Sequence, residues 1–252
     1  ARSSNWKEGY GYTVATEMYS AGIERLTHQP LSFSVSETTE GVHIHIIDAE
    51  LMGKGEKEKK DLYIEGVQNN GIINHYEYII NSEGTIEIRH VLKPEGKMPL
   101  WFPRIVLTLT VSDALDQVKW YGRGPQENYP DRKTGYPMGI YASTVQAMYE
   151  PYLMPQDYGL RTDVRWLQLT TDKGIGLQFK MNEWFNFNIY PYSTDNLTKA
   201  MYTYQLQKQK GMTLNLDYAT TGVGCTARGV FGAYKAMPQE YRRTISIRPM
   251  MK

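Results

Sequence analysis

The chain has 252 residues with 28 basic and 27 acidic side chains, a formal net charge of +1, and one cysteine. This balance gives no electrostatic footprint for nucleic acid or for an anionic membrane, and one cysteine excludes an internal disulfide and a multi-cysteine metal site. No apolar run approaches the ~20 residues of a membrane-spanning helix, so the sequence predicts a soluble protein, cytoplasmic or periplasmic, with neither of these partners.

Hydrophobic alternation with a period of two recurs along the chain and is typical of half-buried strands. Val42, Ile44 and Ile46 point to one face, whereas His43 and His45 point to the other. The same alternation predicts strands within residues 86–89, 104–111, 177–181, 185–189 and 214–216. Because helical periodicity is scarce, we expect an all-β, mainly antiparallel fold.

Three segments depart from this alternation. Gly53 to Lys60 is short and charged, which indicates a solvated hairpin tip between two strands. The stretch from Gly122 to Asp163 is rich in proline and glycine and is predicted to be a long ordered loop region. Ser193 to Ala200 is the best candidate for a helical turn, with Ser193 or Thr194 as its N-cap. No linker-like segment divides the chain, so residues 1–252 are interpreted as one domain.

Two runs in the loop region carry most of the functional signal. Trp120 to Arg132 reads W-Y-G-R-G-P-Q-E-N-Y-P-D-R, and Met148 to Arg161 reads M-Y-E-P-Y-L-M-P-Q-D-Y-G-L-R. Glycine and proline fix an irregular backbone, charged and amide side chains supply donors and acceptors, and aromatic rings supply flat apolar faces. Such a mixture suits a sugar, which needs hydrogen bonds to its hydroxyls and an apolar surface against its ring.

Together the two runs resemble the C-terminal domain of the large β-galactosidases of glycoside hydrolase family two. They stand in the family's order with compatible spacing, and weaker similarity extends the match to about residues 75–252. The resemblance implies a large two-sheet β-sandwich similar to galactose mutarotase, forming the C-terminal domain of a longer enzyme. A chain that begins with Ala1 rather than Met fits such a segment. The implied partners are the catalytic barrel, the other domains of the parent and a galactoside or another carbohydrate, and no cofactor is expected in this chain.

Glu127 and Asp131 are the carboxylates that would suit glycoside hydrolysis, which in retaining enzymes needs two such groups about 5 to 5.5 Å apart. In a turn-rich loop, however, carboxylates more commonly cap backbone N–H groups or pair with arginines such as Arg123 and Arg132. The resemblance points the same way, because both catalytic glutamates of the family lie on a central (β/α)₈ barrel that this chain does not contain. The isolated chain is therefore predicted to be inactive, with no catalytic residue of its own.

The loop residues are left with two candidate roles, substrate contact or docking against the barrel, and a third reading in which they only pin the loops to the sandwich. The stretch from Gly222 to Gly229 lacks the tryptophan that reaches into the galactose site in well-known family members, and Arg228 is the side chain there that could contact a substrate hydroxyl. The candidate residues are Arg123, Glu127, Asn128, Tyr129, Asp131, Arg132, Tyr152, Gln156, Asp157, Arg161 and Arg228.

Two other functions remain open at this stage. The chain could be a stand-alone carbohydrate-binding module, or an aldose 1-epimerase, which needs a general base and a general acid across the sugar ring. His43 and His45 share a strand face, and we interpret them as part of an exposed polar surface. A metal site there would need a third ligand that the sequence does not identify, so no metal is predicted.

Overall fold

The computed structural model describes residues 18, 21–23, 26–52, 70–224 and 229–251. In this part of the chain every pairing between strands is antiparallel, which confirms the all-β prediction. None of the helices described is long and apolar enough to cross a membrane. The elements are β1 (Thr27–Thr38), β2 (Gly41–Leu51), β3 (Gly71–Ile80), β4 (Ile86–Glu95), β5 (Arg104–Val111), β6 (Gln117–Arg123), β7 (Met138–Thr144), β8 (Arg161–Thr170), β9 (Gly176–Tyr190), α2 (Thr194–Lys199), the 3₁₀ turns Thr203–Gln205 and Gly232–Tyr234, β10 (Met212–Thr220) and β11 (Tyr241–Met250).

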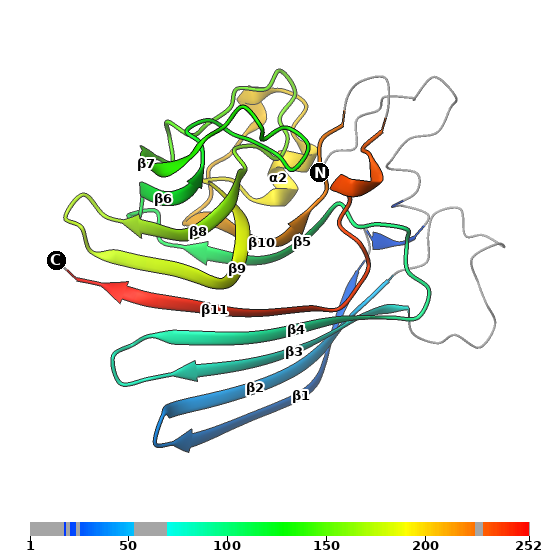
Figure 1. Ribbon diagram of the computed structural model, residues 1–252, viewed down its shortest axis with the longest axis vertical. Coiled ribbons are helices and arrows are strands. Elements are labelled where there is room, and N and C mark those ends of the chain that lie inside the picture. The colour runs from blue at the N-terminus through cyan, green and yellow to red at the C-terminus, as the bar shows by residue number, and fades with distance from the viewer. Residues whose placement is uncertain (1–17, 19–20, 24–25, 53–69, 225–228, 252) are drawn as a thin grey trace.

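Strand β9 joins the layers of the fold (Figure 1). The strand order is β1-β2-β3-β4-β11-β9-β8-β6-β7, and β10 branches from β9 and carries β5 on its other edge. The first part of β9, Gly176 to Met181, pairs with β11, and its later part, Asn186 to Tyr190, pairs with β10. The opposite edge of β9 pairs with β8. The layers of the predicted sandwich are therefore parts of one continuous hydrogen-bonded sheet.

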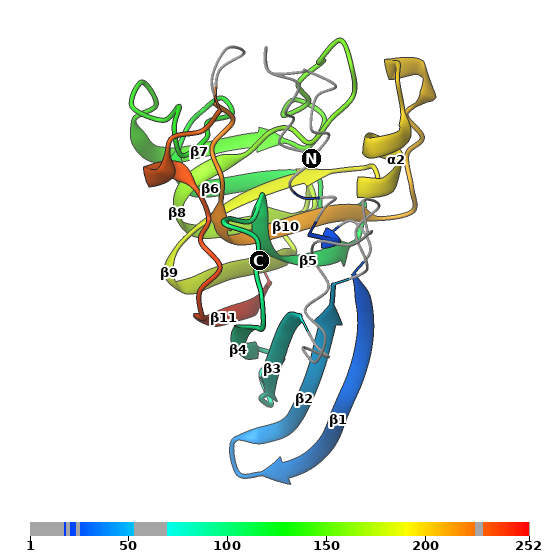
Figure 2. The same cartoon turned by 90° about the vertical axis from the view of Figure 1, so that its right-hand side faces the viewer.

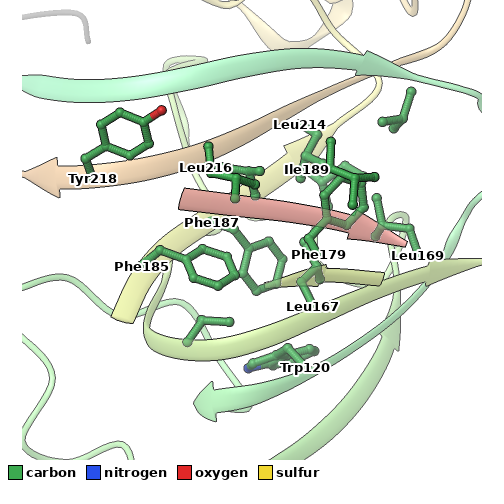
Figure 3. Close-up of a cluster of buried hydrophobic side chains, with 14 of the residues drawn as sticks. Trp120, Leu167, Leu169, Phe179, Phe185, Phe187, Ile189, Leu214, Leu216 and Tyr218 are labelled. Carbon is green, nitrogen blue, oxygen red and sulfur yellow. The ribbon is translucent and has the colours of Figure 1, made fainter. Parts of the chain in front are cut away.

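The main core fills the space between β10 on one side and β6 and β8 on the other (Figure 3). Trp120 of β6 is fully buried, and its ring meets the Phe187 ring of β9 edge-on with the centroids 5.9 Å apart. Leu167 of β8 and Leu216 of β10 are also fully buried. Full burial of each such side chain contributes roughly 1.5–3 kcal/mol, so this cluster stabilises the part of the sheet that carries the loops.

The predicted strands are confirmed at residues 42–46, 86–89, 104–111, 177–181, 185–189 and 214–216. The helical turn is confirmed as well: α2 begins after Ser193, whose hydroxyl accepts the backbone N–H of Asn196 at 3.0 Å. Strands β2 and β3 pair as the two sides of a hairpin, but the predicted tip, Gly53 to Lys60, lies outside the described residues.

The prediction of a long ordered loop region from Gly122 to Asp163 was wrong for the residues in its middle. Strand β7 occupies residues 138–144 and pairs along β6. It is an edge strand in which no residue is fully buried, so its sequence shows no alternation between apolar and polar side chains. The irregular loops are therefore the two segments on either side, residues 124–137 and 145–160.

Strands β1 to β4 form an arm of the sheet beyond β11 (Figures 1 and 2). The buried ring of His90 in β4 ties this arm to the core: Nδ1 lies 2.7 Å from the Tyr218 hydroxyl in β10, and Nε2 lies 3.1 Å from Oδ1 of Asn74 in β3. The ring also stacks on Tyr76 at a centroid distance of 4.0 Å. Burial, with a smaller contribution from His75, lowers the pKa of His90 to about 4. His90 is therefore a neutral structural histidine at pH 7.

Candidate functional site

The two sequence motifs meet at the carboxylate of Glu127, which is 7% exposed. Two of its hydrogen-bond donors belong to the first motif: the Arg132 guanidinium at 2.9 Å and the Tyr129 hydroxyl at 3.2 Å. The other two belong to the second motif: the Tyr152 hydroxyl, and the backbone N–H of Gly159 at 2.9 Å. Burial and the nearby Glu127 raise the pKa of Tyr152 to about 12, which keeps its hydroxyl protonated as a donor. Glu127 is thus fully engaged in holding two loops together.

Asp131 anchors a third loop. Its carboxylate accepts the backbone N–H groups of Val223 at 3.0 Å and Gly224 at 2.7 Å. The approach requires a glycine at position 222, since a Cβ there would lie 2.3 Å from Cγ of Asp131. Asp131 therefore fixes the start of the glycine-rich loop, while the candidate Arg228 lies outside the described residues.

Arg123 closes the base of the first loop. Its Nε donates to Oδ2 of Asp163 at 2.6 Å, and Nη1 donates to the Tyr136 carbonyl at 2.9 Å. Lys133 adds a second cation, with Nζ 2.8 Å from Oδ1 of Asp163. Burial acts to raise the pKa of Asp163, but the hydrogen bonds and charges of Lys133 and Arg123 lower it overall. Asp163, whose φ is 55°, is held in a left-handed conformation by these contacts.

Asn128 and Arg161 are buried beneath the same loop. The Asn128 amide donates to the Gln126 carbonyl at 3.0 Å and accepts the backbone N–H of Thr162 at 3.1 Å. The Arg161 guanidinium donates to the Gly159 carbonyl at 2.9 Å and lies over the Trp120 ring at 5.4 Å. Burial lowers the pKa of Arg161 to about 10, so its charge is retained at pH 7. Both side chains are buried and support the loops from inside.

Asp157 of the second motif belongs to a largely buried polar cluster, the Arg104 network, which consists of the partly exposed Arg104 and Asp157 and the buried Asn188, Asn215 and Asp217. Arg104 donates to Asp217 at 2.7 Å, to both oxygens of Asp157 at 3.3 Å and to Oδ1 of Asn188 at 2.8 Å. Asn188 also donates to Asp157 at 2.9 Å, and Asn215 donates to Asn188 at 2.9 Å. Burial raises the pKa of Asp217 to about 6 against the opposing charge of Arg104. The network fastens the second motif to β5, β9 and β10.

The structure thus brings nine of the candidate residues into one connected set of loops, with Gln156 half-buried next to Asp157. It also adds Arg104, Asn188, Asn215 and Asp217, which the sequence did not single out. The sequence held only a weak signal for these residues, the alternation of Asn215 and Asp217 with leucines in β10. Because β10 is buried on both faces, these polar side chains lie inside the protein.

A hollow of about 350 Å³ lies beside the second motif. Tyr149 and Tyr158 of that motif line it together with Tyr192, Asp116 and Gln209. The Tyr158 hydroxyl is buried and has no hydrogen-bond partner among the described residues. Aromatic faces, acidic and amide side chains and a free buried hydroxyl are groups that can contact a polyol.

The chain is similar to known β-galactosidases. The family described as the beta-galactosidase small chain matches residues 5–247. The chain is 37% identical over 147 residues to a beta-galactosidase of Priestia megaterium, with 58% of this chain and 14% of that protein covered. It is 38% identical over 122 residues to a beta-galactosidase of Vibrio cholerae, with 48% and 11% covered. The matched part thus spans at most about a seventh of these relatives.

Two solved structures are similar in fold: a GalM/aldose epimerase homologue from C. elegans and a galactose 1-epimerase from Lactobacillus acidophilus. The first has a TM-score of 0.43 at 12% identity and covers 87% of this chain and 69% of its own. The second has a TM-score of 0.43 at 11% identity and covers 89% and 66%. The family match covers nearly the whole sequence and includes both motifs. The chain therefore belongs to the family of the β-galactosidase small chain.

Proposed function

We propose that this chain is the C-terminal domain of a β-galactosidase that hydrolyses terminal β-galactosides, and that the catalytic carboxylates lie on a barrel outside it. The observation that carries this proposal is the hydrogen bonding of Glu127, whose oxygens receive four donors from the two motifs. Asp131 is bonded to two backbone N–H groups in the same way. Carboxylates held like this are poor nucleophiles and poor proton donors, so the loops support the enzyme without carrying out its reaction.

The test compares the full-length protein with the 252-residue chain on a chromogenic β-galactoside. We expect hydrolysis by the full-length protein and none by the chain. In the full-length protein, Glu127→Gln should leave kcat per folded molecule within about threefold, since the residue touches no reacting atom. Turnover by the chain alone, abolished by Glu127→Gln, would contradict the proposal.

The loop of the second motif is the proposed surface for docking against the barrel. Leu153 is 95% exposed and Met154 is 44% exposed, although both stand on a loop held by the bond from Tyr152 to Glu127. A rigid loop that presents apolar side chains to solvent suits an interface between domains. Leu153→Asp should lower the thermal stability of the full-length enzyme and leave the free energy of unfolding of the isolated chain unchanged. Equal effects on both would exclude this surface.

Carbohydrate contact by the chain itself is a second candidate function, favoured by the hollow at Tyr149 and Tyr158. Titration of the isolated chain with lactose, followed by the chemical shifts of tyrosine rings, tests it directly. Selective shifts that disappear in Gln209→Ala would support a binding site, whereas uniform insensitivity to millimolar sugar would exclude it. An isolated chain that interconverts α- and β-galactose would instead support the epimerase.

A further inference from the structure

The polar face of the arm gathers three side chains that can bind a transition metal. His43 and His45 stand two residues apart on β2 and share one face of the strand. Glu77 of β3 lies directly opposite His45 in the antiparallel register. The third ligand that the sequence could not supply therefore comes from the neighbouring strand.

The ligand atoms of these three residues lie within 4.8 Å of one another. Oε1 of Glu77 is 3.5 Å from Nδ1 of His43 and 4.0 Å from Nε2 of His45. Tetrahedral Zn²⁺ with bonds of 2.0–2.2 Å places two ligand atoms roughly 3.4 Å apart. The three atoms are thus near the separations that one zinc ion would impose, and a modest side-chain adjustment would complete the geometry.

The hydrogen bonding of the cluster leaves these atoms available. Among the described residues, neither imidazole forms a hydrogen bond with Glu77, although both face its Oε1. The other oxygen of Glu77 accepts a hydrogen bond from Arg89 at 3.0 Å, and Arg89 also donates to Glu87 at 2.8 Å. The carboxylate is therefore oriented by Arg89, whose charge is offset by a second glutamate.

His43 carries a further sign of an incomplete site. Its Nε2 is buried and has no hydrogen-bond partner in the part of the chain that the structure describes. Oε2 of Glu40 lies 3.9 Å from this atom. When a histidine binds a metal through one ring nitrogen, the other usually donates to a carboxylate, which fixes the ring. Glu40 is placed for that role if Nδ1 of His43 binds the ion.

From this geometry we propose that His43, His45 and Glu77 form a Zn²⁺ site with an open fourth position for water. Two imidazoles and one carboxylate favour Zn²⁺ over Mg²⁺ or Ca²⁺, which prefer oxygen ligands. The site lies on strands β2 and β3, outside the loops that hold the two motifs. It joins two adjacent strands of the arm and stabilises the β2–β3 hairpin when metal is bound.

The experiment measures Zn²⁺ stoichiometry of the full-length protein after removal of metal with a chelator. Titration against a chromophoric zinc indicator gives the number of bound ions, and His45→Gln and Glu77→Gln should each bind one ion fewer than wild type. Loss of one ligand should weaken this site by more than about 100-fold. The matched control is His75→Gln, because His75 is an exposed histidine on the same face of β3 and stands outside the cluster.

The visible absorption of bound Co²⁺ provides a second readout. It would not differ between wild type and the variants if His45 and Glu77 had only a structural role. Wild type and His75→Gln should show the visible absorption of tetrahedral Co²⁺, and its intensity should fall in His45→Gln and Glu77→Gln. Thermal unfolding without metal should be alike in all four proteins, since the substituted side chains are not fully buried. Equal zinc stoichiometry and equal Co²⁺ absorption in wild type and His45→Gln would overturn the proposal.

Discussion

The substitution Glu127→Gln tests whether the joined motifs are a structural unit. A carboxylate is an acceptor at both oxygens, whereas the glutamine amide offers one acceptor and one donor group. Tyr129 and Gly159 donate to Oε2, and Arg132 and Tyr152 donate to Oε1. Whichever way the amide turns, its NH₂ group takes the place of an oxygen that accepted two hydrogen bonds.

The arrangement that costs less free energy places the amide oxygen toward Gly159, whose N–H is buried, and the NH₂ group toward Arg132. The Arg132 side chain is 49% exposed, so water can replace part of the lost bond. Hydrogen bonds to a charged group are worth about 1.5–3 kcal/mol; the Tyr152 hydroxyl can turn to accept from the NH₂ group, but only in a weaker neutral bond, and part of the bond from Arg132 is lost. We therefore expect the free energy of unfolding to fall by about 3 kcal/mol.

Urea unfolding of the 252-residue chain, followed by tryptophan fluorescence, measures this change. Glu83→Gln is the control, because Glu83 is exposed in the β3–β4 turn, and its effect should stay within about 0.5 kcal/mol. Tyr152→Phe should cost about 1 kcal/mol alone and much less in the Glu127→Gln background. A loss below 0.5 kcal/mol for Glu127→Gln, or full additivity with Tyr152→Phe, would refute the reasoning.

Three further substitutions probe the rest of the structure. Because the pKa of His90 is about 4 in the folded chain and 6.5 when unfolded, the unfolded state binds the proton first, and stability falls as pH drops from 6.5 toward 4. Between pH 7 and pH 5 the wild type should lose about 2 kcal/mol more than His90→Gln in urea unfolding, and parallel pH profiles would contradict this. Trp120→Ala removes a fully buried ring and should cost about 3–5 kcal/mol, with a fall in melting temperature measured by calorimetry. Gly222→Ala should cost about 1–3 kcal/mol, since its Cβ displaces the Asp131 carboxylate; hydrogen exchange at Gly224 should then accelerate.

Alternation was sufficient to predict the confirmed strands because apolar and polar side chains alternate along them, whatever the final burial of each face. The segments 42–46 and 86–89 alternate in sequence and are strands in the arm, although Ile88 alone among these residues is fully buried. It was insufficient for β7, an edge strand with no buried face. It also could not reveal the Arg104 network, because Arg104 and Asp217 are 113 residues apart and meet only when β5 and β10 pair. Contacts of that separation depend on strand register, which local patterns do not specify.

The sequence predicted that the loop carboxylates pair with arginines and backbone N–H groups. It did not predict every partner of each carboxylate, which the structure identifies. Arg132 lies five residues from Glu127 and was a foreseeable partner, but Tyr152 and Gly159 lie 25 and 32 residues away. The two motifs are separated in sequence by β7, yet each supplies two of the donors that Glu127 accepts. A change in either motif leaves a buried carboxylate or its donors unpaired, so the two motifs function as one element. Both runs lie within residues 5–247, which the family of the β-galactosidase small chain matches, so this interdependence belongs to the matched part of the chain.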